Sequence, residues 1–192
     1  DPAPVLALLE LLKDDPALYV RRSVANNLND IGKDHPEVLT RTTHQWLQGA
    51  SEERQWIVRH ALRTAIKRGE PGALAVLGFG TQADVAVRGA QITPSRAAIG
   101  EKVVLAFEVV NRSAASQRVL VDFRIHYTKA NGSTAAKVFK LKTLELQAGE
   151  TARLQKSVSL AQMSTRTHYP GRHQVDALLN GHAEPLGHFD LN

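Results

Sequence analysis

Residues 19–31 read Tyr19-Val20-Arg21-Arg22-Ser23-Val24-Ala25-Asn26-Asn27-Leu28-Asn29-Asp30-Ile31. Apolar residues recur here at helical spacing, which predicts a helix with one face turned toward a core, formed by Val20, Val24, Leu28 and Ile31. The opposite stripe is polar and consists of Arg22, Asn26, Asn29 or Asp30, and Lys33. Arg and Asn side chains suit phosphates and base edges. A single carboxylate among cations repels phosphate, so Asp30 needs an explanation.

A second copy of this pattern lies 37 positions later, at Trp56–Lys67. In the overlay Tyr19 matches Trp56, and Arg22 matches Arg59. A further helix is expected after each copy, opening at prolines 36 and 71, because proline suits the first helical turn. Helix pairs that repeat at such intervals are typical of HEAT or armadillo-like solenoids. The matched arginines would then line one surface of the array.

We expect Asp15 to cap the first of these helices, with Pro16 in its first turn and Gly32 at its end. Further helices are expected over Pro36–Leu47, after an N-cap at Ser51, and from Pro71 to Leu77. The element before them, Pro4–Lys13, is apolar at Val5, Leu6, Leu8, Leu9, Leu11 and Leu12. It resembles an internal helix whose packing partner lies upstream. We therefore expect a C-terminal fragment of a longer protein.

The composition changes at Gly78-Phe79-Gly80, after which alternating, β-branched segments are separated by turn residues. Seven strands are predicted, at Val85–Ile92, Lys102–Asn111, Arg118–Thr128, Lys137–Leu146, Thr151–Leu160, His173–Leu179 and Leu186–Leu191. This number and spacing favour an immunoglobulin- or fibronectin-like sandwich. The predicted organisation is a multidomain chain, α then β. Residues 1–80 form HEAT-like helical repeats at the end of a longer solenoid, and residues 81–192 form an immunoglobulin-like β-sandwich.

The composition limits the function. Residues 1–80 hold 10 basic and 10 acidic side chains, so the whole excess of +5 lies in residues 81–192, and a basic excess suits a polyanionic partner or only a soluble basic domain. With no cysteine, disulfides and thiolate metal sites are excluded. No apolar run is long enough to span a membrane. The histidines of the β part have no metal-ligand spacing: His126, His168, His173, His182 and His188.

Residues 19–36 resemble the strongest block of the AlkC-type bacterial DNA alkylation-repair glycosylases, and residues 56–69 are similar to the block that follows. Members of that family have a HEAT-like solenoid, and some carry an appended immunoglobulin-like domain in the same order as here. The resemblance covers essentially the whole chain, but specific motifs occur only in those two blocks.

The resemblance implies a DNA-3-methyladenine-type N-glycosylase. This hydrolase cleaves the N-glycosidic bond of cationic N-alkylated bases in double-stranded DNA, without metal or cofactor and without fully flipping the base. The sugar gains positive charge as the bond breaks, so a carboxylate can stabilise the transition state. Asp30 occupies the acidic position of the matched block, and the resemblance gives it this catalytic role. We further expect a cytoplasmic monomer with no membrane partner, whose active site is incomplete without upstream residues.

The expected DNA contacts are Arg22, Asn26, Asn27, Lys33, Arg59, His60 and Arg63. Each has a plainer alternative. Asp30 could simply pair with Lys33, the arginines could form a solvated face, and the asparagines could brace neighbouring helices. His60 could be structural, and Trp56 is expected in the core. Arg112, Lys140, Lys142, Arg166 and Arg172 could form a phosphate-binding surface or be scattered solubilising charge.

Two other functions remain open: a non-catalytic DNA-binding HEAT module, and a protein-scaffolding solenoid that binds no nucleic acid. Replacing Asp30 by Asn separates an enzyme, which loses rate, from a pure DNA binder, which gains affinity. The salt dependence of binding separates both from a protein scaffold, because phosphate contacts make affinity fall steeply with salt.

Overall fold

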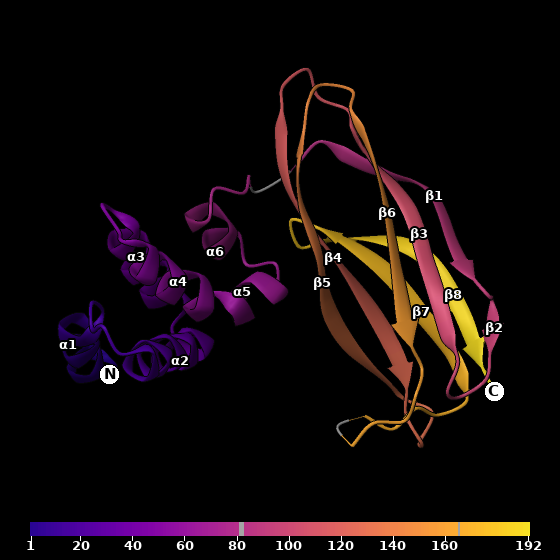
Figure 1. The fold of residues 1–192 in the computed structure, drawn as a ribbon, viewed down its shortest axis with the longest axis horizontal. Helices are drawn as coiled ribbons and strands as arrows, with labels where there is room; N and C mark the ends of the chain where they lie inside the picture. The colour runs from indigo at the N-terminus through magenta and orange to yellow at the C-terminus, as the bar shows by residue number, and fades with distance from the viewer. Residues whose placement is uncertain (81–82, 165) are drawn as a thin grey trace. The chain divides into compact units, whose positions relative to one another are not determined.

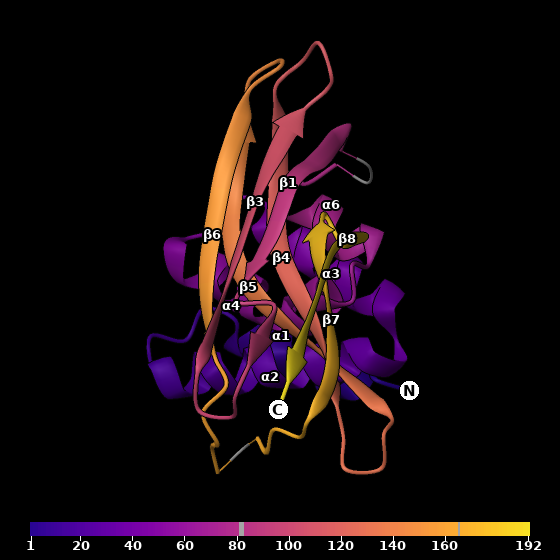
Figure 2. The ribbon, with the colours of Figure 1, turned by 90° about the vertical axis from the view of Figure 1, so that its right-hand side faces the viewer.

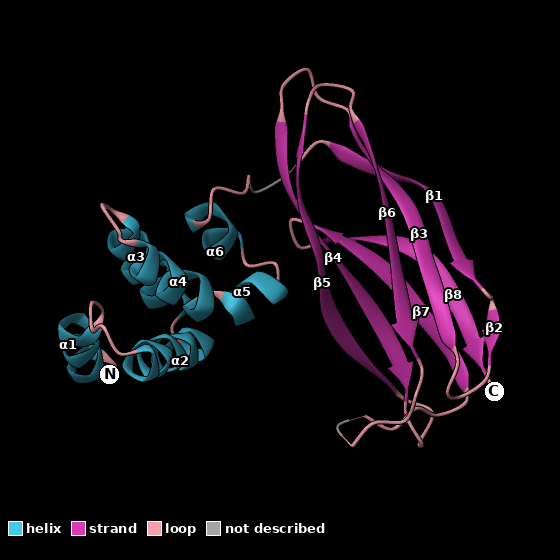
Figure 3. Ribbon diagram, in the orientation of Figure 1, coloured by secondary structure: helices cyan, strands magenta, loops and turns pink. Residues whose placement is uncertain are grey.

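The computed structural model describes residues 1–80, 83–164 and 166–192, and the chain divides into two compact units, residues 1–81 and residues 82–192. Helices make up the first unit and strands the second (Figure 3). The boundary predicted between residues 80 and 81 touches residue 81, which lies outside the described residues.

The helical unit contains, in chain order, α1 (Ala3–Leu12), α2 (Leu18–Asp34), α3 (Pro36–Leu47), α4 (Glu52–Ala61), α5 (Arg63–Lys67) and α6 (Pro71–Val76) (Figure 1). Helix α2 packs against α1, α3, α4 and α5. The apolar stripe predicted for it is buried at Val24 and Leu28 and half-buried at Val20 and Ile31. No helix among the described residues is long and apolar enough to cross a membrane.

Both ends predicted for α2 were wrong. The helix begins at Leu18 rather than at Pro16, and Asp15 does not cap it. The Asp15 carboxylate instead accepts a hydrogen bond from the Ala17 N–H at 2.7 Å, which shapes the loop before the helix. Nor does Gly32 end the helix, which runs on to Asp34. Gly32 is buried, and a Cβ at this position would run into the Leu39 side chain of α3. This glycine therefore allows the close approach of two helices.

The second copy of the repeat is not one helix. It divides at Leu62 into α4 and α5, so the prediction of a continuous helix over Trp56–Lys67 was wrong. Other signals are confirmed. The Ser51 hydroxyl caps α4 by accepting a hydrogen bond from the Arg54 N–H at 3.3 Å, and prolines occupy the first turns of α3 and α6.

The second unit is a β-sandwich of β1 (Val85–Thr93), β2 (Arg96–Ala97), β3 (Lys102–Asn111), β4 (Gln117–Thr128), β5 (Thr134–Leu146), β6 (Thr151–Ser159), β7 (Gly171–Leu179) and β8 (His182–Leu191). One sheet has the strand order β1-β3-β6 and the other β2-β8-β7-β4-β5. The sheets form two layers (Figure 2) whose inward side chains make one apolar core. In β4 the predicted alternation is confirmed, since Phe123, Ile125 and Tyr127 all lie in this core.

All seven predicted strands are present. Strand β3 has the predicted bounds, and each of the other six differs at one end. The predictions missed β2, a two-residue strand that pairs in parallel with β8. Strands β5, β7 and β8 begin earlier than predicted, and β6 ends at Ser159 rather than Leu160. The part of β8 before the predicted start contains Pro185, and proline disfavours a strand when only the sequence is read.

Two histidines are buried in the β unit. Burial lowers the pKa of His168, an effect reinforced by the charges of Arg166 and His173. Neither ring nitrogen of His168 has a hydrogen-bond partner among the described residues. Burial also lowers the pKa of His173, opposed by the hydrogen bond between its Nε2 and the Tyr169 carbonyl. Both rings are therefore neutral in the folded protein at neutral pH.

We predict that replacing Gly32 by Ala destabilises the helical unit by about 1–3 kcal/mol, because the added methyl group overpacks the contact with Leu39. Trp46 and Trp56 are the chain's two tryptophans, so tryptophan fluorescence during urea unfolding reports on this unit alone. Gly80→Ala is the control, because a Cβ there meets nothing within 4 Å. Equal unfolding midpoints for the two variants would contradict the packing role of Gly32.

We also predict that the β unit loses stability as the pH falls below about 6.5, the ordinary histidine value. The unfolded chain then takes up protons that His168 and His173 do not bind in the folded state, because their folded pKa values are lowered. Urea titrations at pH 7.5 and 5.5, followed by methyl NMR signals of the β unit, measure this. His168→Phe should reduce the difference between the two pH values, and equal stability of the wild type at both would refute the prediction.

Candidate nucleic-acid interface

One face of α2 carries the polar stripe predicted from the sequence. The exposed residues Arg22, Asn26, Asp30 and Lys33 recur at intervals of three or four along it, so they lie on the same side of the helix. The opposite side packs into the unit through Val24 and Leu28, among others. Burial of that side fixes which way the polar stripe faces.

Asn29 does not belong to this stripe, although it was predicted there as an alternative to Asp30. Its side chain is only 3% exposed, on the buried side of α2. A shift of one residue turns a helical side chain by about 100°. Asp30 is therefore the exposed member of the pair.

The carboxylate of Asp30 is ionised and held among cations. Lys33 Nζ lies 2.7 Å from Asp30 Oδ1, and both side chains remain about half exposed or more. The hydrogen bond from Lys33 is the main reason that the pKa of Asp30 is lowered, with help from Asn29 and from the charge of Arg63. The predicted alternative of a simple Asp30–Lys33 pair thus exists in the structure, and it keeps the carboxylate charged at neutral pH.

Arg63 joins the two copies of the repeat. Its Nη2 donates a hydrogen bond to Asn26 Oδ1 at 3.1 Å, across the 37 residues that separate the two copies. Its Nη1 donates to the His60 carbonyl at 2.7 Å, near the division between α4 and α5. One connected group of charges and amides therefore consists of Arg63, Asn26, Asp30 and Lys33. Through its bond to Arg63, Asn26 also braces a neighbouring helix.

Arg59, His60 and Trp56 lie together on α4. The His60 ring stacks on Trp56 with 4.8 Å between ring centres, and Arg59 reaches Gln55 on its own helix at 3.5 Å. Arg59 is exposed, whereas Trp56 is half-buried rather than a core residue. The stacking on Trp56 gives His60 a structural contact, which was the alternative to a DNA contact. The Arg59 side chain is exposed to solvent.

Two predicted contacts remain outside the connected group. Asn27 donates to the Ser23 carbonyl of its own helix at 2.9 Å. Arg22 is exposed and makes no hydrogen bond or ion pair with any residue that the structure describes. Arg22 is thus an unneutralised cation on the stripe.

The sequence reading gave Tyr19 no role beyond its match to Trp56. The structure shows that Tyr19 is 81% exposed. It precedes Arg22 by three positions and Asn26 by seven, so it lies on the same stripe, about 16 Å along the helix axis from Asp30. The match between Tyr19 and Trp56 did not predict this exposure, because Trp56 is half-buried.

Of the five basic residues that could form a phosphate-binding surface on the β unit, Lys140 and Lys142 are exposed, and the three arginines have partners. Arg112 pairs with Asp84 and Arg172 with Asp190, and Arg166 lies over the rings of Tyr127 and Phe139. Among the described residues there is no group of three or more His, Asp or Glu side chains that could hold a metal ion.

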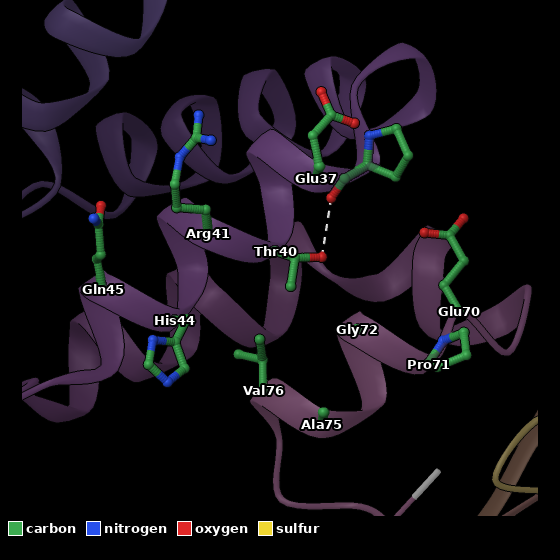
Figure 4. Close-up of a pocket in the computed structure, with 11 residues that line it drawn as sticks. Glu37, Thr40, Arg41, His44, Gln45, Glu70, Pro71, Gly72, Ala75 and Val76 are labelled. Atoms are coloured by element: carbon green, nitrogen blue, oxygen red, sulfur yellow. Dashed lines mark hydrogen bonds between the residues drawn. The ribbon is translucent and has the colours of Figure 1, made fainter.

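A groove with a volume of about 830 Å³ lies between α3 and α6. Figure 4 shows Thr40 of α3 opposite Gly72 of α6, with Arg41 and His44 further along α3. None of the eight predicted site residues lines this groove. The groove and the charged stripe are therefore separate features of the helical unit.

Comparison with known proteins gives three results. The family model of the C-terminal Ig-like domain of the uncharacterised protein YhaZ matches residues 86–192. The uncharacterized protein YhaZ of Bacillus subtilis (strain 168) is 38% identical over 181 residues, which is 94% of this chain and 50% of that protein. The Pseudomonas fluorescens alkylpurine DNA glycosylase AlkC, solved bound to DNA containing an abasic site analog, superposes with a TM-score of 0.93 at 42% identity over 100% of this chain and 53% of that chain. The chain thus spans about half the length of both relatives.

Proposed function

This chain belongs to the family of the YhaZ C-terminal Ig-like domain, and from that premise we propose that it is part of a DNA-repair glycosylase. The proposed substrate is double-stranded DNA that contains cationic N-alkylated bases such as 3-methyladenine. The proposed reaction is hydrolysis of the N-glycosidic bond, without metal or cofactor. The likeness to an alkylpurine DNA glycosylase along the whole chain supports this proposal.

The observation that carries the proposal is the ionised Asp30 carboxylate beside Lys33 on the polar face of α2. A surface that only held phosphates would bind DNA more tightly without this negative charge. When an N-glycosidic bond breaks, the sugar gains positive charge, and a nearby carboxylate stabilises that state more than the ground state. Asp30 is therefore proposed to stabilise the sugar or to position the attacking water.

The remaining residues are proposed to hold the DNA. Arg22, Lys33 and Arg59 supply cations for backbone phosphates. Asn26, Asn27, His60 and Arg63 supply hydrogen-bond donors close to them, and Tyr19 adds an exposed aromatic ring to the same face. We propose that α1 to α6 are HEAT-like repeats whose polar stripes form this DNA-facing surface. The protein is further proposed to act as a monomer in the cytoplasm.

We predict that Asp30→Asn lowers the rate of base release from methylated duplex DNA about a hundredfold, a loss of about 2.7 kcal/mol of transition-state stabilisation. Because the chain spans about half of its relatives, the assay uses the full-length product of the encoding gene. Rates are compared at matched DNA occupancy, so that tighter binding by the variant does not obscure the loss.

Glu37→Gln is the matched control, since Glu37 is an exposed helical carboxylate that lines the α3–α6 groove instead. It should leave the rate unchanged. If the wild type binds DNA in a salt-sensitive way but releases no base, the non-catalytic DNA-binding module becomes the better description. If it binds no DNA, the protein scaffold does.

We predict that Arg59→Ala weakens binding about equally for different DNA sequences, and that the slope of log K against log salt becomes shallower by about one unit. The physical reason is the loss of one phosphate contact and of the counterions that it releases. Fluorescence anisotropy at several salt concentrations measures the slope. Arg41→Ala is the control, an exposed arginine on α3 outside the stripe, and an unchanged slope for Arg59→Ala would remove Arg59 from the interface.

A further inference from the structure

Asn29 is a buried amide beside Asp30, the carboxylate of the polar stripe that pairs with Lys33. It is 3% exposed and lies on the side of α2 that packs into the helical unit. Its Oδ1 accepts no hydrogen bond from any described residue. A buried carbonyl without a partner destabilises a fold, and an apolar side chain of similar size would avoid that penalty.

The surroundings of Asn29 offer no compensation for this carbonyl. The gap beside it has an empty volume of about 150 Å³. Its lining includes the apolar residues Gly32, Leu39 and Ala65 and the polar residues Lys33, Thr64, Arg68 and Glu70. That space does not admit a sphere the size of a water molecule, and a bridging water needs such room. None of the polar residues that line the gap donates a hydrogen bond to the Asn29 carbonyl, so this side of the amide has no partner among the described residues.

The other end of the amide has a partner. Asn29 Nδ2 donates to Asp30 Oδ1 at 3.5 Å, the same oxygen that Lys33 Nζ approaches at 2.7 Å. No described residue donates a hydrogen bond to Asp30 Oδ2. Both donors thus act on one carboxylate oxygen and leave the second oxygen open.

We propose that Asn29 is a positioning residue for Asp30: its buried amide anchors Oδ1, so that Oδ2 faces the sugar of the damaged nucleotide. This inference rests on the proposed glycosylase function. It assigns no contact between Asn29 and DNA.

Lys33 alone is a poor anchor for a catalytic carboxylate. Its side chain is 49% exposed and carries the ammonium group at the end of a flexible stem. The phosphates of bound DNA compete for that charge. Asn29 is held by burial and is out of reach of phosphates. When a phosphate draws Lys33 away, Asn29 remains the donor on Oδ1, and the long bond to it is free to shorten.

The test replaces Asn29 by Leu, which has a similar size and removes both the donor and the unpartnered carbonyl. We expect base release to fall roughly tenfold at matched DNA occupancy, since the carboxylate loses one long hydrogen bond from a neutral donor. DNA affinity should stay the same, and the urea midpoint followed by tryptophan fluorescence should stay the same or rise. Loss of rate without loss of stability separates positioning from a structural role.

Two further readouts depend on Asp30 itself. In an Asp30→Asn background, Asn29→Leu should have no additional effect on the rate. In the wild-type background, the acid limb of the pH–rate profile should move to higher pH, because hydrogen bonds from Lys33 and, more weakly, Asn29 lower the pKa of Asp30. Asn29→Ala serves as a second variant, with the same expected rate loss, in case leucine is not accommodated.

An unchanged rate for Asn29→Leu and Asn29→Ala, beside an active wild type and a slow Asp30→Asn, would overturn this inference and leave the proposed function intact. So would an equal rate loss in the Asp30→Asn background, or a loss of rate that only follows a loss of stability. A wild type that releases no base would overturn the proposed function and this inference together.

Discussion

The packing of α2 against α3 and α4 is the constraint on which the candidate site depends. Gly32 lets α2 approach the Leu39 side chain of α3, and the buried Val24 and Leu28 hold the same side of the helix in the core. A helix fixed on one side has its other side fixed as well. The positions of Arg22, Asn26 and Asp30 at the surface therefore follow from contacts on the far side of the helix.

Charge then determines what this surface can do. Asp30 would weaken a purely phosphate-binding surface, yet its neighbours keep it ionised, Lys33 most strongly and Arg63 at longer range. Arg63 also bonds to Asn26, so the second repeat supports the first. A carboxylate fixed within a cationic surface suits a reaction in which positive charge develops on a substrate that is itself a polyanion.

Much of this arrangement could be predicted from the sequence, because it depends on local periodicity. The alternation of Phe123, Ile125 and Tyr127 placed β4 correctly, and helical spacing identified the stripe with Asp30. Helix ends were predicted less well. Asp15 and Gly32 have the residue types of a cap and a stop, but the Asp15 side chain shapes a loop and Gly32 meets Leu39 from another helix. Such contacts between segments leave no local pattern. For the same reason the sequence did not predict the division of the second repeat at Leu62. Nor did it predict the hydrogen bond from Arg63 to Asn26.

Asn29 shows most clearly what local pattern cannot provide. By spacing, Asn29 and Asp30 were equivalent candidates for the polar stripe, and by residue type an asparagine is ordinarily exposed. The structure shows that Asn29 is buried where α3 and α5 pack near it. Its Oδ1 has no partner among the described residues, and its Nδ2 donates to the Asp30 carboxylate. A group that weakens the fold and touches a charged neighbour is better explained by the site than by the core, since functional sites are where local rules of stability are broken. The same reasoning separates two residues of α2: Gly32 makes room for the Leu39 side chain of α3, whereas the side chain of Asn29 donates its hydrogen bond to Asp30.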